Sequence, residues 1–531
     1  MIAVGLATSI AAAVLSSTIF GRMPHVQDSI AQLFQARIFA MGRLWAPSPP
    51  LREFFDYAHM VNDGRWYSQY PPGHALLLVP GVWLGAPWLV NPLLAGLGVA
   101  ATYLLARVSF DRTTARVSTL LGLASPFLLF MAAEFMSHVS GFFLLTAFLA
   151  FFVLALRAGR ARYRMAAAVF LALAVLTRPY TAIALALPAL LWAVGHWRTA
   201  RSRESARALW IVPGGIAAGM LLYALYNWGT TGDPLLPGYV KLYGPAHGIG
   251  FGKGSWGRPH TLSIGLKHAW EVLGSLNGHL FQWPVTSVWP ILLALLPPLA
   301  VLRQIRWGPR SARVHWRRAW LFAAFPLAVL TAHLFYWYYD FCFGPRYLYD
   351  ALGPLLIVSG WGVVRAARWI GRVWDVRGAA AVLGVVVLAL FLYAGLVRWP
   401  RLIQPPAEAA SAPPGSAARV VSYFRNYTPE YWGVSPYLGR LVEREGLRHA
   451  LVFVRFTGQR SDVLPVRHMW FGSAFAHQQP DLGNARVIYA QDRGPENVKL
   501  ARLFPDRTHY LYTGNIEEGR ILKLAPPERE R

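Results

Sequence analysis

The feature that most constrains this chain is a succession of long apolar runs that carry almost no charge. Uncharged runs of about 18 residues or more are typical of helices that cross a lipid bilayer. Only 14% of the residues are charged, whereas soluble proteins carry about 25%. We therefore predict a mainly α-helical, polytopic membrane protein with about 11 transmembrane helices. The predicted spans are 2–20, 89–107, 114–131, 139–156, 165–177, 180–197, 208–228, 285–302, 319–336, 348–366 and 379–397.

The basic residues gather in short clusters between these runs. The formal net charge of +26 would suit a nucleic-acid partner, but short basic loops between spans are what the positive-inside rule predicts for cytoplasmic loops. We therefore expect no nucleic acid. All clusters lie on one side if the N-terminus is cytoplasmic and the C-terminus is outside, which predicts a multi-pass protein of the cell inner (cytoplasmic) membrane. The clusters are Arg107–Arg116, Arg157–Arg164, Arg198–Arg207, Arg303–Arg318 and Arg365–Arg377.

The first apolar run and the cysteine content set two further limits. The run Ile2–Phe20 is rich in alanine like a signal peptide but lacks a basic segment before it. Because many spans follow, we predict a retained first span. Cys342 is the only cysteine, which excludes an intrachain disulfide and a cysteine-based metal site.

The chain divides into two predicted domains, a transmembrane catalytic domain (residues 1–398) and an extracytoplasmic α/β domain (residues 399–531). Within the first, residues 21–73 and 229–284 form outer loops. The second begins with a Pro/Ala/Ser-rich linker, Gln404–Ser416. Its pattern predicts strands at 450–456, 485–489 and 508–512 and helices at 437–445 and 496–503. It contains no nucleotide-binding glycine loop and no nucleophile elbow, so its role stays open.

A short polar segment with a helical pattern, His25–Arg43, follows the first predicted span. Asp28, Gln32 and Gln35 lie at positions i, i+4 and i+7, so they share one helix face. The opposite, apolar face suits the membrane surface; it carries Ile30, Leu33, Phe34, Ile38 and Met41. Asp28 is either a general base at the mouth of a membrane-embedded cavity or a carboxylate favoured by the helix dipole.

A second motif in the same loop is Trp66-Tyr-Ser-Gln-Tyr-Pro-Pro-Gly-His74, which comes directly before an apolar stretch. An acidic residue after the first span, followed by Tyr-Pro-Pro, resembles the GT-C superfamily of membrane glycosyltransferases. The branch with protein O-mannosyltransferases and the aminoarabinose transferase of lipid A is the most similar. Arg178-Pro179 and Phe343-Gly-Pro-Arg-Tyr347 also resemble that branch. The resemblance covers roughly residues 1–370.

This resemblance implies an enzyme that moves a sugar from a polyprenyl-phosphate carrier to a lipid, glycan or protein acceptor at the outer membrane face. Asp28 is then the base that activates the acceptor, and Gln32, Tyr70 and His74 are candidate substrate-binding residues. The family often has Asp-Glu at this point, whereas Ser29 follows Asp28 here. A second acidic group, if one is needed, must come from elsewhere.

Glu134 is a candidate for that second acidic group, and His138 lies one turn later on the same face. This pair either contributes to substrate binding or lines a helix end. A Glu/His pair at i, i+4 is also compatible with a metal, but two residues are too few to predict one. No nucleotide or redox cofactor is implied, and a divalent metal is possible.

A lipid-phosphate leaving group requires a cation or oriented donors, for which arginine is well suited. Arg178 and Arg346 stand at outer ends of predicted spans, where they either contact substrate or reach toward lipid headgroups. Lys253 and Arg258 lie in a Gly-rich stretch that is either a loop closing over substrate or a plain connector. The other outward-facing cations are Arg37, Arg65 and Lys241.

Three further interpretations complete the sequence-based prediction. The aromatic run Phe335–Tyr339 is typical of an interfacial belt, and stacking on a sugar ring is the alternative. A transporter or flippase is the main rival function, although the internal symmetry typical of many transporters is not visible. A membrane scaffold whose tail binds a cell-wall partner is the second rival.

Overall fold

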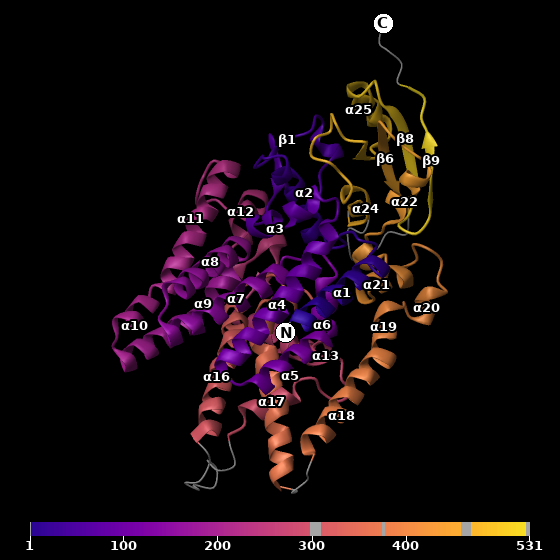
Figure 1. The fold of residues 1–531 in the computed structure, drawn as a ribbon. Helices are drawn as coiled ribbons and strands as arrows, with labels where there is room; N and C mark the ends of the chain where they lie inside the picture. The colour runs from indigo at the N-terminus through magenta and orange to yellow at the C-terminus, as the bar shows by residue number, and fades with distance from the viewer. Residues whose placement is uncertain (1, 298–309, 374–377, 458–468, 527–531) are drawn as a thin grey trace.

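The protein is described here from a computed structural model, which places residues 2–297, 310–373, 378–457 and 469–526. Most of these residues form a bundle of helices, and a smaller α/β unit lies at one end of it (Figure 1). The α/β unit and the end of the bundle that carries α2 (Gln27–Ala40) form the upper part of Figure 1. We call this the outer end.

The bundle helices follow the apolar runs predicted from the sequence. A helix overlaps each of the eleven predicted spans, although residues 298–302 of the predicted span 285–302 fall outside the described residues. The helices are α1 (Ile2–Thr18), α4 (Val90–Ser109), α5 (Arg112–Leu123), α6 (Pro126–Ala132), α7 (His138–Ala158), α8 (Ala161–Thr177), α9 (Pro179–Ala200), α11 (Ile211–Thr231), α14 (Trp289–Leu295), α16 (Arg310–His333), α17 (Leu352–Val373) and α18 (Ala379–Tyr393).

The multi-pass architecture is supported, whereas the number of spans is not fixed at eleven. Within the described ranges, six helices are long and apolar enough to cross a membrane, or seven if the bent pair α5 and α6 counts as one span. That pair is bent by 58°. The bend falls at Ser125-Pro126, where Ser125 accepts a hydrogen bond from the Leu128 amide and Pro126 occupies the first turn of the new helix. Proline is favoured at this position because the first turn needs no backbone donor.

A polar chain segment covers the outer end of the bundle. It contains α2, the short helix α3 (Pro72–Trp83) and a three-stranded antiparallel sheet in the order β1-β3-β2. The strands are β1 (Ala46–Pro47), β2 (Met60–Asn62) and β3 (Arg65–Ser68). The second outer segment contributes α12 (Gly238–Tyr243), α13 (Leu262–His279) and a small hairpin of β4 (Gly252–Lys253) and β5 (Pro259–His260).

The C-terminal residues form a four-stranded sheet in the order β7-β6-β8-β9. β6 (Ala450–Phe456) pairs in parallel with β7 (Val487–Gln491) and β8 (Thr508–Gly514), and β9 (Gly519–Lys523) runs antiparallel to β8. The predicted strands correspond to β6, β7 and β8, and the predicted helices correspond to α22 (Tyr437–Arg444) and α25 (Asn497–Leu503). The remaining tail helices are α19 (Trp399–Ile403), α20 (Ala407–Ala410), α21 (Ala417–Arg425) and α24 (Gly472–Phe475).

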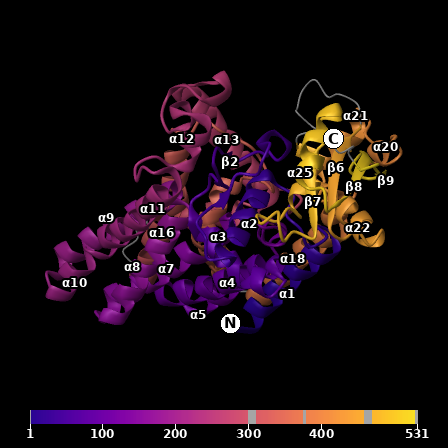
Figure 2. The same ribbon diagram turned by 90° about the horizontal axis from the view of Figure 1, so that it is seen from above.

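The α/β unit shares one hydrophobic core with the first outer segment. Phe34 of α2 stacks on Phe475 of α24, and Tyr57 stacks on the same ring. Ile30, Phe34 and Ile38 are fully or almost fully buried. The prediction that this face of α2 lies on the membrane surface is therefore wrong for Ile30, Phe34 and Ile38, which the shared core covers. Leu33 packs against α3, and Met41 is exposed. Figure 2 shows the α/β unit on one side of α2 and α12 on the other.

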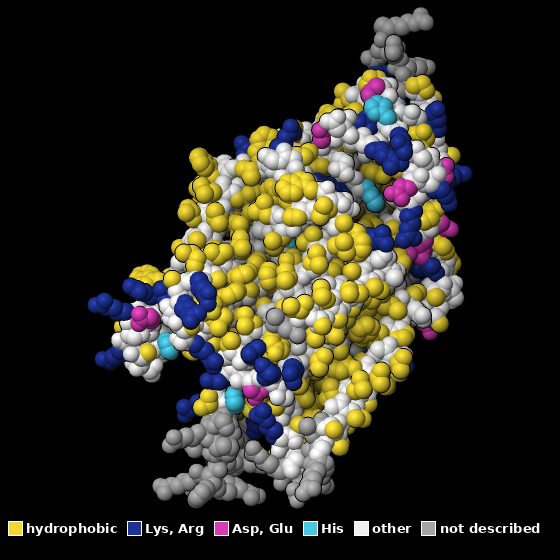
Figure 3. All heavy atoms as spheres, viewed as in Figure 1, with side chains coloured by type: hydrophobic (Ala, Val, Ile, Leu, Met, Phe, Trp, Pro, Cys, Tyr) yellow, Lys and Arg dark blue, Asp and Glu magenta, His cyan; other side chains and the backbone are white. Residues whose placement is uncertain are grey.

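The charge distribution divides the surface into zones. Hydrophobic side chains form a broad belt over the middle of the bundle, and Lys and Arg side chains gather below it and over the α/β unit (Figure 3). A belt of this kind is expected where lipid replaces water around a helical bundle. The basic loops thus lie at the end opposite α2.

Candidate active site

A cavity of about 340 Å³ opens at the outer end of the bundle and collects most of the predicted site residues. Six of the ten predicted catalytic and substrate-binding residues line it, which are Asp28, Gln32, Tyr70, His138, Arg178 and Arg346. The remaining wall consists largely of aromatic and small side chains from α11, α12 and the segment after α16, including Tyr223, Tyr239, Tyr336, Tyr338 and Tyr347. The cavity therefore has a few charged groups in an aromatic lining, as ligand sites usually do.

Asp28 lies on the first turn of α2 and faces this cavity. Its Oδ2 accepts a hydrogen bond from Arg346 Nη1 at 2.9 Å, and its Oδ1 lies 3.4 Å from His59 Nε2. The Asp28 side chain is 21% exposed, whereas that of Arg346 is 5% exposed. Arg346 Nε also lies 2.6 Å from Asp340 Oδ1. One buried arginine thus holds two carboxylates, and Asp28 is the more accessible partner in its pair with Arg346.

The two carboxylates on Arg346 have opposite pKa shifts. Burial raises the pKa of Asp28, but Arg346, His59 and a hydrogen bond from Tyr70 outweigh burial, so the pKa is lower than usual. Burial is also the largest effect on Asp340, and there the net result is a raised pKa. Asp28 is consequently ionised at neutral pH and able to accept a proton or to orient a hydroxyl group.

A second charged cluster surrounds Arg178, at the junction of α8 and α9. Arg178 Nε donates to Asp350 Oδ2 at 3.0 Å, and His138 Nδ1 lies 3.2 Å from the same oxygen. Arg178 Nη1 donates to the Ser137 hydroxyl at 3.2 Å. Asp350 is fully buried, whereas the Arg178 side chain is 17% exposed and lines the cavity. The carboxylate therefore fixes a cation at the cavity wall.

Three other cations predicted to face outward have structural partners. Arg37 donates to the carbonyl oxygens of Gln478 and Ala476. Arg65 donates to the carbonyl oxygen of Thr230, and Lys241 pairs with Asp63 at 2.8 Å. These contacts attach the outer segments to one another. Of the seven candidate cations, Arg178 and Arg346 are the two that line the cavity.

Glu134 does not line the cavity but holds the start of the helix that carries Asp28. Its Oε1 accepts hydrogen bonds from the His25 amide at 2.6 Å, the Val26 amide at 3.4 Å and the Ser29 hydroxyl at 2.9 Å. Burial raises the pKa of Glu134 to about 7, although these donors oppose the effect. Ser29 stands where the family often has Glu, and its hydroxyl contacts the carboxylate of Glu134.

His74 is buried between α3 and α7. Its Nε2 donates to the Phe135 carbonyl oxygen at 2.8 Å, so its Nδ1 accepts from the Ser140 hydroxyl at 2.7 Å. Lys253 and Arg258 are exposed on the β4–β5 hairpin and do not line the cavity. His74 thus lies behind the cavity wall, close enough to Arg178 and His138 to interact with them electrostatically, whereas the two hairpin residues are placed outside the cavity. A role in substrate binding stays a prediction for each of the three.

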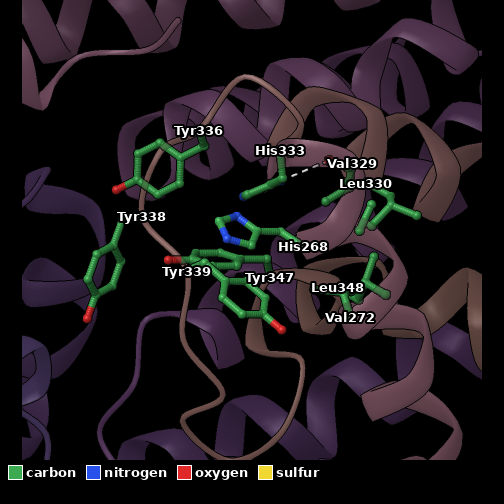
Figure 4. Close-up of a pocket in the computed structure, with 12 residues that line it drawn as sticks. His268, Val272, Val329, Leu330, His333, Tyr336, Tyr338, Tyr339, Tyr347 and Leu348 are labelled. Atoms are coloured by element: carbon green, nitrogen blue, oxygen red, sulfur yellow. Dashed lines mark hydrogen bonds between the residues drawn. The ribbon is translucent and has the colours of Figure 1, made fainter. Parts of the chain in front are cut away.

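Part of the aromatic run at 335–339 faces the cavity rather than lipid. Tyr336 and Tyr338 line it together with His333 and Tyr347. The same four side chains also line a much smaller pocket of about 20 Å³ between α13 and α16, where Tyr339 stacks on His268 (Figure 4). These aromatic residues form a shared wall, so the interfacial-belt interpretation does not describe the whole run.

The sequence analysis missed His59, Asp340 and Asp350. His59 contacts Asp28 and Asp350 contacts Arg178, each from a distant part of the chain. Asp340 contacts Arg346 within the same short segment between α16 and α17. Asp350 carried the one usable signal, since an uncompensated carboxylate within a predicted span is costly and often functional. Within the described residues, no three His, Cys, Asp or Glu side chains come together as a metal-ligand set. Metal dependence stays an open prediction.

Comparisons with known proteins show which family and which fold the chain resembles. Residues 81–224 match the dolichyl-phosphate-mannose-protein mannosyltransferase family, and no curated protein matches the sequence. ArnT from Cupriavidus metallidurans bound to undecaprenyl phosphate is 18% identical with a TM-score of 0.50, over 89% of this chain and 76% of ArnT. The archaeal oligosaccharyltransferase AglB from Archaeoglobus fulgidus, in complex with an inhibitory peptide and a dolichol-phosphate, is 12% identical with a TM-score of 0.43, over 96% and 69%.

The family match and the ArnT-like fold confirm the resemblance to GT-C membrane glycosyltransferases predicted from the sequence. They support a membrane glycosyltransferase in general terms. Identities this low establish the fold and leave the donor, the acceptor and the roles of individual residues to be argued from the cavity.

Proposed function

We propose that this GT-C-type protein transfers a sugar from a polyprenyl-phosphate carrier to an acceptor at the outer face of the cytoplasmic membrane. The observation that carries the proposal is the joint presence of Asp28 and Arg178 in one cavity of about 340 Å³. A sugar transferase of this kind needs a proton acceptor for the nucleophile and a cation for the departing phosphate. The cavity contains Asp28 as the candidate proton acceptor and Arg178 and Arg346 as candidate cations.

Asp28 is the proposed general base. In the proposed step, an acceptor oxygen attacks the anomeric carbon while its proton passes to Asp28. The bond between that carbon and the phosphate oxygen breaks, and its electron pair leaves with the phosphate. A single displacement of this kind inverts the configuration at the anomeric carbon. Burial by itself would raise the pKa of Asp28, but Arg346, His59 and Tyr70 together outweigh it. The resulting low pKa keeps the carboxylate ionised before the reaction.

Arg178, with His138 beside it, is the proposed phosphate contact. Arg346 already pairs with two carboxylates, so a phosphate there would meet Asp28 and Asp340 as well. Arg178 pairs with one carboxylate, which lies behind it in the protein interior. An arginine fork held from one side presents its remaining donors to an anion. The tyrosine-lined wall between the two clusters is suited to contact with a sugar ring.

Purified protein assayed with a panel of labelled polyprenyl-phosphate sugars tests the proposal. We expect hydrolysis or transfer with at least one donor, and Asp28→Asn should lower the rate by about 10²–10⁴-fold, the usual contribution of a general base. Asp63→Asn is the matched control, because Asp63 lies in the same outer loop and pairs with Lys241 outside the cavity. Full activity of Asp28→Asn would overturn the base assignment, and transport of the carrier without bond cleavage would favour the transporter alternative.

A further inference from the structure

A second cavity lies at the opposite end of the same helices that frame the active-site cavity. We call it the opposite-end cavity; it has a volume of about 580 Å³. Its lining comes mainly from the last turns of α7 and α9 and the first turns of α16, and consists of Ser109, Val153, Leu156, Arg157, Trp192, His196, Val314, Arg317, Arg318 and Leu321. The active-site cavity contacts the other ends of these three helices, at His138, Pro179 and His333.

The distance between the cavities matches the thickness of a bilayer. α7 has 21 residues and contributes His138 to one cavity and Arg157 to the other. At a rise of 1.5 Å per residue these positions lie roughly 30 Å apart, about the thickness of the hydrocarbon layer. If the active-site cavity lies at one membrane surface, the opposite-end cavity lies at the head-group level of the other leaflet.

The opposite-end cavity is lined by positive charge without counter-charge. Three arginines and a histidine line it, and none of the described lining residues is acidic. Arg157 and Arg318 are close enough to repel each other, and Arg318 Nη1 donates to the Ser109 carbonyl oxygen at 2.6 Å, which fixes its guanidinium. The carboxylate of Asp111 pairs with Arg368, whose Nη2 lies 3.0 Å from Asp111 Oδ2.

Apolar side chains share the lining with the arginines. Val153, Leu156, Trp192 and Leu321 lie in the same cavity. A site with cations at the membrane surface and apolar groups beside them fits an amphipathic anion, and basic pockets between transmembrane helices bind lipid head groups in this way. A small soluble phosphate would use the cations and leave the apolar wall without contacts.

We propose that the opposite-end cavity binds the phosphate head group of an anionic phospholipid, with an acyl chain along its apolar wall. This site is separate from the transfer chemistry and does not depend on it. Arginine charge at the membrane surface provides the attraction, and the bundle ends of α7, α9 and α16 provide the shape.

Native mass spectrometry of the full chain tests this proposal, with phosphatidylglycerol and phosphatidylcholine as probes. We expect tight retention of phosphatidylglycerol and little retention of phosphatidylcholine. Arg157→Gln/Arg317→Gln should weaken phosphatidylglycerol retention by about tenfold or more. These two side chains are exposed, so their replacement should not disturb the core, and the unfolding temperature checks this.

The control variant is Arg116→Gln/Arg160→Gln, which removes the same charge from the same end of the bundle at exposed positions outside the cavity. It should retain phosphatidylglycerol like the parent protein. An equal loss in both double variants would show a diffuse charge effect and overturn the proposal. Displacement of the lipid by millimolar glycerol 3-phosphate would instead assign the site to a soluble phosphate and overturn the lipid assignment.

Discussion

Arg346 and Arg178 both line the outer cavity, but they differ in how their charge is balanced. Arg346 contacts two carboxylates, Asp28 and Asp340. Arg178 contacts one carboxylate, Asp350. The first cluster is therefore rich in negative charge and suits a proton acceptor, whereas the second leaves a cation facing the cavity and suits an anion. The same residue type serves opposite purposes because its partners differ.

The largest expected effect comes from removing the cation of the first cluster. Arg346→Gln leaves two half-buried carboxylates without their counter-ion, so we expect a loss of up to about 3 kcal/mol of stability together with loss of transfer. Thermal unfolding in detergent measures the first effect. Adding Asp340→Asn should restore part of the stability because one uncompensated charge is removed. An unchanged unfolding temperature in Arg346→Gln would show that Asp28 and Asp340 do not need Arg346 as their counter-ion. It would thereby contradict the difference in charge balance between the two clusters.

Replacing the cation of the second cluster should act on the lipid carrier. Arg178→Gln/Asp350→Asn removes cation and counter-ion together, so the interior stays balanced. We expect affinity for polyprenyl phosphate to fall by about 10- to 100-fold, the effect of a hydrogen bond to a charged group. Asp28→Asn should leave this affinity unchanged. Microscale thermophoresis with a soluble short-chain polyprenyl phosphate measures this affinity in both variants. A larger loss of affinity in Asp28→Asn than in Arg178→Gln/Asp350→Asn would reverse the assignment of the two clusters.

A smaller effect is expected from Glu134, which acts on the first cluster through α2. Glu134→Ala removes the acceptor of the His25 and Val26 amides and leaves the Ser29 hydroxyl with only the Val26 carbonyl oxygen, so Asp28 loses its fixed position. We expect kcat to fall by about tenfold with KM unchanged. Glu134→Gln keeps the accepting oxygen and should restore most of the rate. A KM effect without a kcat effect would argue against a positioning role.

The smallest effect concerns the pH dependence of stability. The pKa of Glu134 is raised by burial to about 7, so the folded state binds a proton that the unfolded state has released between about pH 4.5 and pH 7. This contribution is fully present below about pH 4.5 and is lost as the pH rises through 7. The unfolding temperature should therefore fall more steeply from pH 5 to 8 in the parent than in Glu134→Gln. Parallel curves would contradict the raised pKa.

The helices of the bundle could be predicted because each apolar run carries its own signal. The residues from 114 to 131 were predicted as one span, whereas Ser125-Pro126 divides them into two helices at 58°. Ser125-Pro126 is a local signal for the start of a new helix. The continuous hydrophobicity of the run nevertheless led to the prediction of a single span. The apolar face of α2 was assigned to lipid because no sequence pattern shows which surface will cover it, and the core shared with the C-terminal unit covers Ile30, Phe34 and Ile38 instead.

The site was predicted in part for a related reason. Asp28 and Arg178 stand next to recognisable motifs, so residue type and spacing pointed to them. His59 and Asp350 have no such motif, and their importance comes from contacts with Asp28 and Arg178, which lie far away in the sequence. Asp340 lies close to Arg346 in the sequence, but spacing within a loop does not show that the two side chains meet. Glu134 stays a prediction as a site residue, and its hydrogen bonds at the start of α2 favour a role in supporting Asp28 over a substrate contact.

The sequence by itself predicted a helical membrane protein that resembles the GT-C glycosyltransferases, because hydrophobic runs and short motifs are local properties. The tertiary structure decided which charges meet. Arg37, Arg65 and Lys241 look as suitable for a phosphate as Arg178 does, yet they are used to join outer segments. The interaction of two charges depends on their separation and burial, and both are fixed only when distant parts of the chain pack together.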